Sequence, residues 1–123
     1  MFMSVEFDIE VDVLVIGAGG CGLTAAIAAQ DAGAETAVVE KLDRPGGNTS
    51  LSSGSIPGAG TRFQAAAGIR DDATRFRADL ARVSGPHDAP HVEAVLAERS
   101  AELVEWLVDS AGVTLELVKT YRH

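Results

Sequence analysis

The chain has 123 residues, of which 46% are apolar and 23% charged, a composition typical of a single folded globular domain. Its 10 Lys and Arg against 18 Asp and Glu give a formal net charge of −8, which argues against nucleic acid or an anionic membrane as the main partner. The single cysteine excludes an internal disulfide. Because we find no basic secretory signal and no apolar run long enough to span a membrane, we expect a cytoplasmic protein.

The first part of the chain predicts a strand–helix–strand unit. Residues 5–12 alternate between apolar and acidic side chains, which indicates an extended segment with one wet face. Residues 13–16, VLVI, are apolar on both faces, as in a central parallel strand that is covered on both sides. A glycine-rich turn, GAGGCG, leads into an alanine-rich helix over residues 23–31, and residues 36–39 form a second strand that ends at Glu40. Such crossovers are right-handed almost without exception.

The rest of the chain predicts a long loop followed by helices. Residues 41–61 are rich in Gly, Ser, Asn and Pro, which is typical of a binding loop, with a flexible linker as the alternative. Three helices are expected, over residues 62–67, from Asp71 or Asp72 to about Val83, and from Asp88-Ala89-Pro90 to Gly112. The third helix carries an apolar stripe that predicts its buried face: Val92, Val95, Leu96, Leu103, Leu107 and Val108. Residues 113–118 alternate again and predict a final strand.

The strongest signal for function is the spacing of three glycines at the front of the first helix. Gly17, Gly19 and Gly22 follow an apolar strand directly, and Glu40 ends the next strand, which is the full context of a dinucleotide-binding fingerprint. Gly17 allows the tight turn, Gly19 lets a diphosphate approach the backbone, and Gly22 lets helix and strand pack closely. Glu40 can accept hydrogen bonds from an adenosine ribose and would repel a 2′-phosphate. The alternative is a glycine-rich turn without a ligand, and the fingerprint by itself allows NAD or FAD.

A second glycine pair, Gly46-Gly47, follows Glu40 closely and precedes Asn48 and Thr49. Bare backbone there lets another segment approach the cofactor, and amide and hydroxyl groups can bond its oxygens. The fingerprint followed by EKLDRPGGNTSLSSG resembles the flavoprotein subunits of fumarate reductase and succinate dehydrogenase, a family that includes flavocytochrome fumarate reductases and 3-ketosteroid dehydrogenases. The segments GTRFQAAAGIRDD and VLAERSAELVEWLVDSAGVTLEL are also similar to that family, so the resemblance covers nearly the whole chain.

The residues and the resemblance together predict an α/β fold: a Rossmann-like FAD-binding βαβ unit with following helices and an incomplete doubly wound parallel sheet. Residues 1–61 would form the FAD-binding unit and cofactor loop, and residues 62–123 a helical segment and terminal strand that begin the remainder of a larger flavoprotein. The resemblance implies that Ala18, Gly19 and Cys21 line the diphosphate, that Glu40 holds the ribose, that Lys41 lies near the adenine, and that Gly47, Asn48, Thr49, Ser53 and Gly54 follow the cofactor toward the flavin ring.

The resemblance also implies a flavin-dependent oxidoreductase that transfers hydride between FAD and a carbon–carbon bond of an organic acid or ketosteroid. Ser55, where many fumarate reductases have another glycine, resembles the ketosteroid dehydrogenase branch more. The family's catalytic positions have no counterpart in residues 1–123, so we assign no catalytic residue and expect a small-molecule substrate only if the protein is completed.

The predicted strands are too few for a complete doubly wound sheet. We therefore expect an N-terminal piece of a larger flavoprotein, or half of a split one, whose missing strands come from absent sequence or another polypeptide. Exposed sheet edges would make such a chain prone to aggregation. Two alternatives remain: a nicotinamide-dependent dehydrogenase fragment, and a non-catalytic cofactor-fold module that is completed by another chain.

Other candidate residues carry weaker signals. His87 and His91 are placed to share one side of a helix start, but no third ligand has sensible spacing, so we expect no metal site. The loop serines lack a nucleophile elbow and partner residues. Cys21 is expected to be a small structural residue near the helix start whose backbone can touch the cofactor.

Overall fold

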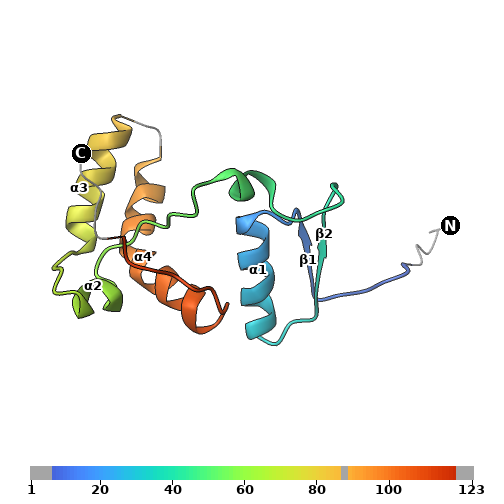
Figure 1. Ribbon diagram of the computed structural model, residues 1–123. Coiled ribbons are helices and arrows are strands. Elements are labelled where there is room, and N and C mark those ends of the chain that lie inside the picture. Colours follow the sequence, from blue (N-terminus) through green and yellow to red (C-terminus); the bar gives the residue numbers. More distant parts are fainter. Residues whose placement is uncertain (1–6, 87–88, 119–123) are drawn as a thin grey trace. The chain divides into compact units, whose positions relative to one another are not determined.

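The computed structural model describes residues 7–86 and 89–118 of the chain. They divide into two units between Ser55 and Ile56, and each is described by itself below. The first unit contains β1 (Val13–Ile16), α1 (Gly20–Asp31), β2 (Thr36–Val39) and the 3-10 helix η1 (Gly47–Leu51), and the second contains α2 (Arg62–Ala66), α3 (Ala73–Ser84) and α4 (Pro90–Asp109) (Figure 1). None of the helices in the described ranges is long and apolar enough to cross a membrane.

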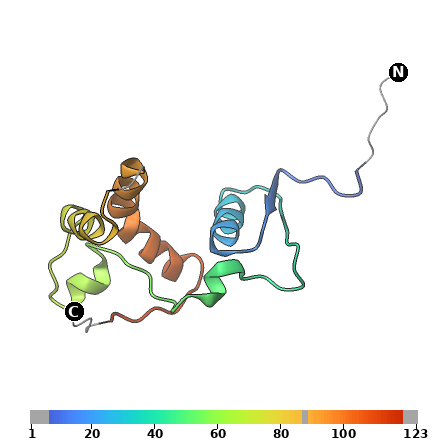
Figure 2. The same cartoon turned by 90° about the horizontal axis from the view of Figure 1, so that it is seen from above.

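The first unit is a parallel strand pair joined by a helix. β1 and β2 pair in register, with Val13 opposite Thr36 and Ile16 opposite Val39. Parallel strands need a crossover connection, and α1 supplies it, lying beside both strands in Figure 1 and beside β1 in the view of Figure 2. The predicted strand–helix–strand order is confirmed, although α1 already begins at Gly20 rather than at Leu23. Within the predicted loop, η1 is the regular element that the sequence did not indicate.

Only one face of β1 is covered. Val15 faces α1, since its Cγ1 would lie 3.2 Å from a Cβ built on Gly22. On the opposite face Leu14 is 56% and Ile16 84% exposed. Within the described residues of the first unit nothing packs on the second face of β1, so the cover on both sides that the pattern of residues 13–16 indicates stays a prediction.

The acidic–apolar alternation before β1 does not produce a strand. Phe7 and Ile9 are exposed, and residues 7–11 form no regular element. Alternation predicts an extended segment only where a neighbouring strand covers one face, and none of the described residues supplies that neighbour. The predicted segment also includes Val5 and Glu6, which lie outside the described residues.

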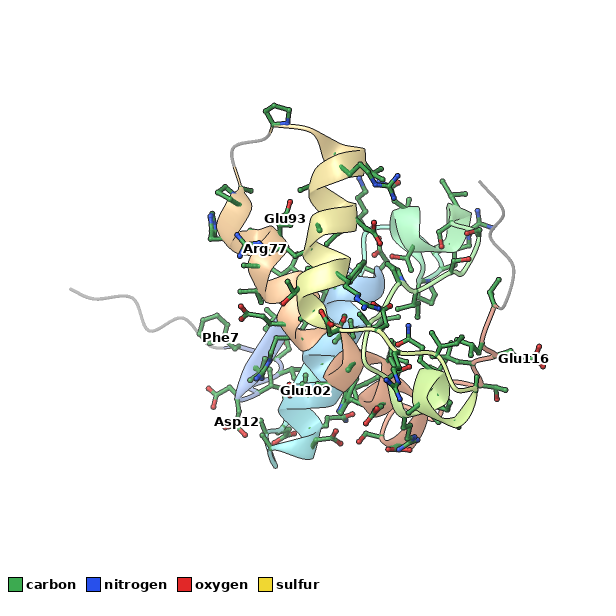
Figure 3. The ribbon with its side chains drawn as sticks, turned by 90° about the vertical axis from the view of Figure 1, so that its left-hand side faces the viewer. Phe7, Asp12, Arg77, Glu93, Glu102 and Glu116 are labelled. Atoms are coloured by element: carbon green, nitrogen blue, oxygen red, sulfur yellow. The ribbon has the colours of Figure 1, made fainter. Side chains whose placement is uncertain are left out.

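The second unit is built from capped helices. Asp72 caps α3 by accepting a hydrogen bond from the Arg75 N–H at 2.9 Å, as the sequence predicted for Asp71 or Asp72. Pro90 occupies the first turn of α4, where its missing N–H costs nothing. α3 packs against α4, and the Arg77 guanidinium lies 3.3 Å from a Glu93 carboxylate oxygen across that contact (Figure 3).

The buried face of α4 differs from the predicted apolar stripe. Its buried residues are Ala97, Ser100 and Val104. The larger side chains Val92, Val95 and Leu96 are exposed, whereas Leu103, Leu107 and Val108 are half-buried. The stripe was therefore wrong for the first half of the helix. Small side chains are buried instead because they allow the neighbouring backbone to approach α4 closely.

The predicted final strand over residues 113–118 is also wrong: this stretch is irregular. The Val113 N–H donates a hydrogen bond to the Leu107 carbonyl at 2.8 Å, which closes the end of α4. Alternation alone does not form a strand, and no neighbouring strand is found in the part of the chain that the structure describes.

Candidate functional site

Two glycines shape the turn between β1 and α1. Gly17 has a φ of +103°, which L side chains rarely adopt, and its N–H donates a hydrogen bond to the Val39 carbonyl at 2.7 Å. A Cβ built on Gly22 would lie 1.9 Å from the Gly17 carbonyl oxygen. Only glycine fits at position 22, because any side chain would force α1 away from the turn.

The backbone at Gly19 is accessible. A Cβ built on this residue would meet only the Gly46 carbonyl oxygen, at 3.9 Å. Two residues on, Cys21 is exposed in the first turn of α1, and its N–H has no acceptor among the described residues. N–H groups at the start of a helix carry partial positive charge, so this surface favours an anionic group.

The Glu40 carboxylate lies at the same turn. Its Oε2 accepts a hydrogen bond from the Ala18 N–H at 2.8 Å, and its Oε1 accepts one from the Leu42 N–H at 3.0 Å. These bonds, that from Ala18 above all, hold the pKa of Glu40 below its ordinary value of 4.5. The side chain is therefore an anion at neutral pH, and each of its oxygens keeps a lone pair for a further donor such as a hydroxyl.

The second glycine pair docks directly on the first glycine turn. The Gly46 N–H donates to the Ala18 carbonyl at 2.8 Å, and Gly46 forms a parallel bridge with Gly19. A Cβ built on Gly47 would lie 3.5 Å from the Gly19 Cα. The two segments thus form one continuous backbone surface, as close approach between bare backbones allows.

The structure brings most of the residues expected at the site together, but not all. The cluster at the turn consists of Gly17, Ala18, Gly19, Cys21, Gly22, Glu40, Gly47 and Thr49. Asn48 lies exposed in η1, and Lys41, Ser53 and Gly54 are exposed as well. Within the described ranges Asn48, Ser53 and Gly54 have no hydrogen bond to the turn, whereas the backbone of Lys41 is bonded to Glu40.

Two glycines beside this cluster were not predicted as site residues: Gly20 was not singled out, and Gly46 was noted only as one of the second glycine pair. A Cβ on Gly20 would lie 2.8 Å from the Thr49 Oγ1, and one on Gly46 would lie 2.9 Å from the Ser50 Cβ. Both glycines stand beside residues that were singled out, but the spacing of the fingerprint leaves them unspecified. The available signal was the doubling of glycine in each segment, Gly19-Gly20 and Gly46-Gly47.

The expectation that His87 and His91 form no metal site stays a prediction. His87 lies outside the described residues, and His91 is exposed at the start of α4. In the two described ranges, no group of three or more His, Cys, Asp or Glu side chains is placed to hold a metal ion.

Comparison with known proteins gives a consistent picture. Residues 12–120 match a family model described as an FAD binding domain. The chain is 38% identical over 109 residues to an NADH:fumarate oxidoreductase of Klebsiella pneumoniae (strain 342), which covers 89% of this chain and 12% of that protein.

Two solved structures are also similar. A 3-ketosteroid-delta4-(5alpha)-dehydrogenase from Rhodococcus jostii RHA1 matches with a TM-score of 0.74 and 36% identity, covering 85% of this chain and 22% of that one. The open conformation of a flavocytochrome c3 fumarate reductase matches with a TM-score of 0.73 and 37% identity, covering 80% of this chain and 17% of that one. The chain therefore spans less than a quarter of the length of each of these three relatives.

The residues at the turn fit the cofactor that the family model names. The accessible backbone at Gly19 and the unpaired N–H of Cys21 suit a diphosphate, and the Glu40 carboxylate suits ribose hydroxyls. Since the family model matches nearly the whole chain and these features agree with it, the chain belongs to the FAD-binding domain family, and FAD is its cofactor.

Proposed function

We propose that this chain holds the adenosine diphosphate part of FAD in a flavin-dependent oxidoreductase. The accessible backbone at Gly19, beside the ionised Glu40 carboxylate, carries the proposal. The reaction would be hydride transfer between FAD and a carbon–carbon bond of an organic acid or ketosteroid. That choice is supported by relatives whose names state a fumarate reductase and a ketosteroid dehydrogenase activity.

We propose that three groups of residues contact three different parts of FAD. The N–H groups of Gly19 and Cys21 would donate to the diphosphate, with Ala18 beneath it and Gly17 and Gly22 shaping the turn. Glu40 would accept hydrogen bonds from the adenosine ribose, with Lys41 toward the adenine. Gly47, Asn48, Thr49, Ser53 and Gly54 would follow the cofactor toward the flavin. Bound FAD supplies the hydride chemistry, and this chain's residues bind and orient it.

We further propose that the strand pair is part of a larger, doubly wound parallel sheet. The exposed Leu14 and Ile16 side chains support this, since strands of parallel sheets are usually covered on both faces. The substrate-binding and catalytic groups would then lie on further polypeptide, which the length of the relatives also favours.

The binding site is tested by placing a methyl group at Gly19. Gly19→Ala should keep the fold, because its Cβ has room within the protein, and should weaken FAD binding by about tenfold or more by obstructing the diphosphate. The measurement is an FAD titration followed by flavin absorbance and fluorescence quenching, with circular dichroism to verify folding. Gly22→Ala is the matched contrast: its Cβ would collide with Gly17, so it should lose helical signal as well. A folded Gly19→Ala variant with unchanged FAD affinity would refute the proposed cradle.

The single cysteine gives an independent readout that needs no turnover. Cys21 is exposed at the proposed diphosphate site, so FAD should slow its alkylation by iodoacetamide in the 123-residue chain. NADH is the matched comparison, because it carries the same adenosine diphosphate group. If NADH protects Cys21 and FAD does not, the nicotinamide-binding alternative replaces the proposal.

A further inference from the structure

We propose that Thr49 is a positioning residue for the FAD site, which caps the first N–H of α1 and so holds the second glycine segment against the turn. The inference rests on the proposed placement of the FAD diphosphate at this turn. It assigns Thr49 a role that acts through the backbone of Gly20, in addition to any contact with the cofactor.

The cap is supplied from a distant part of the chain. The N-cap residue of α1 is Gly19, which has no side chain with which to satisfy the first helical N–H groups. The Thr49 Oγ1 accepts a hydrogen bond from the Gly20 N–H at 3.0 Å, from a position 29 residues later. A threonine hydroxyl is a preferred capping group, so Thr49 does for α1 what a local serine or threonine does for other helices.

The contact with Thr49 requires that residue 20 has no side chain. A Cβ at position 20 would lie 2.8 Å from the Thr49 Oγ1 and 3.1 Å from its Cγ2. Any larger residue would displace the hydroxyl from the N–H that it caps. The pair therefore explains a glycine for which the dinucleotide fingerprint has no role.

The cap leaves one N–H group at the start of α1 bonded to Thr49 and another available for the cofactor. Since Thr49 occupies the N–H of Gly20, the exposed N–H of Cys21 remains for a phosphate oxygen. The Thr49 hydroxyl proton itself has no acceptor in the described part of the chain, so it can still be donated. Together with the bond from the Gly46 N–H to the Ala18 carbonyl, the cap fixes the register of the two glycine segments before FAD arrives.

The experiment is a double-mutant cycle on the full chain, with FAD affinity as the readout. Thr49→Val keeps the shape of the side chain but removes the hydroxyl, and should weaken FAD binding by about tenfold. Thr49→Ser should restore affinity to within about twofold, since it keeps the capping oxygen. Gly20→Ala should weaken binding as Thr49→Val does. Combining the two should be no worse than either alone, because both remove one contact.

Ser50→Ala is the matched control for the loss of a neighbouring hydroxyl. Among the described residues, the Ser50 Oγ donates a hydrogen bond only to the Gly47 carbonyl within η1, at 2.9 Å, so this variant should bind FAD as the unmodified chain does. The positioning role would be overturned if Thr49→Val and Thr49→Ser bound FAD with equal affinity. It would also be overturned if the loss of affinity in the double variant equalled the product of the losses caused by Thr49→Val and Gly20→Ala alone.

A second readout keeps this inference separate from the proposed function. In the protein without FAD, Thr49→Val should raise the alkylation rate of Cys21 by loosening the start of α1, whereas Thr49→Ser should not. If the unmodified chain bound no FAD, the proposed function would fail, and this rate would still decide whether the cap exists. An alkylation rate that is identical in all three proteins would overturn the cap.

Discussion

At the scale of single residues, Glu40 links the end of β2 to the glycine turn. Both of its carboxylate oxygens accept backbone N–H groups, one from Ala18 and one from Leu42. These bonds favour the ionised form, so the pKa of Glu40 is lower in the folded chain than in the unfolded one. The stabilisation from Glu40 is therefore fully present above its ordinary pKa of 4.5 and is lost as the pH falls through the lower, folded value.

This linkage predicts the pH dependence of FAD binding. Affinity should be constant from about pH 6 to pH 8 and should fall in acid, because protonated Glu40 releases one backbone N–H and loses an acceptor for the ribose. Glu40→Gln should bind FAD about tenfold more weakly at neutral pH, since its amide has one acceptor oxygen for two backbone donors. Its affinity should also lack the acid-side fall that is due to Glu40. FAD titrations across this range check both effects.

Glu35→Gln is the control for the pH experiment. The Glu35 side chain is exposed, and in the part of the chain that the structure describes Glu35 forms hydrogen bonds only through its backbone, with Asp12 and Val13. Its substitution should leave both the affinity and the pH profile unchanged. An acid-side fall that persists unchanged in Glu40→Gln would mean that another group controls binding.

The sequence predicted those residues of the site that belong to a pattern of fixed local spacing. Strand, glycines, helix and acid follow one another in a fixed order, so Gly17, Gly22 and Glu40 could be singled out without coordinates. The partner of the Gly20 N–H lies 29 residues away, and that of the Ala18 N–H lies 22 residues away. Such pairs depend on how two segments dock, which no local pattern encodes.

At the scale of elements, a buried polar network joins the loop before α2 to the middle of α4. The Ser100 Oγ accepts a hydrogen bond from the Ala59 N–H at 3.1 Å and donates one to the Ala97 carbonyl at 3.1 Å. Ser100 is only 1% exposed. Nearby, Thr61 and Gln64 cap α2 reciprocally, and Gln64 also donates to Asp71 at 2.9 Å. Every one of these polar groups is satisfied inside the unit, as buried polar groups must be.

Removing the Ser100 hydroxyl should destabilise the second unit. Ser100→Ala leaves the buried Ala59 N–H without an acceptor, and we expect a loss of about 1–3 kcal/mol in the free energy of unfolding. Urea unfolding followed by circular dichroism measures it. Arg99→Ala, on the adjacent and exposed position of α4, breaks only a surface pair with Glu102 and should change stability by no more than about 0.5 kcal/mol. Equal stabilities of the two variants would show that the network does not hold the loop.

Ser100 also explains why the buried face of α4 was not predicted. Periodicity identifies large apolar side chains, and it selected Val92, Val95 and Leu96, which are exposed. The burial observed here centres on Ser100, which accepts the Ala59 N–H and lies where the backbone at Gly58 comes close to α4, and Ser100 is neither large nor apolar. Helix boundaries were better predicted, because capping residues such as Asp72 act within a few residues of the end that they mark.

At the scale of the whole molecule, an uncovered apolar sheet face favours association between copies of the chain, and the net charge disfavours it. Leu14 and Ile16 of β1 are exposed on this face, and Val39 of β2, which pairs with Ile16, is exposed as well. The formal net charge of −8 repels copies of the chain from one another. Charge repulsion between surfaces is screened beyond about 8 Å at physiological ionic strength, whereas apolar attraction is not weakened by salt. Salt should therefore shift the balance toward association.

We predict that the 123-residue chain associates increasingly as salt is added, and that Ile16→Thr reduces this association. Threonine keeps the branched shape that suits a strand and removes apolar surface from the most exposed position of β1. Sedimentation velocity at low and high salt gives the distribution of species. Val15→Thr is the matched control: because Val15 faces α1, its substitution should lower stability without reducing association. A chain that stays monomeric at every salt concentration and unfolds cooperatively, with a stability of several kcal/mol, would show that β1 and β2 need no further cover.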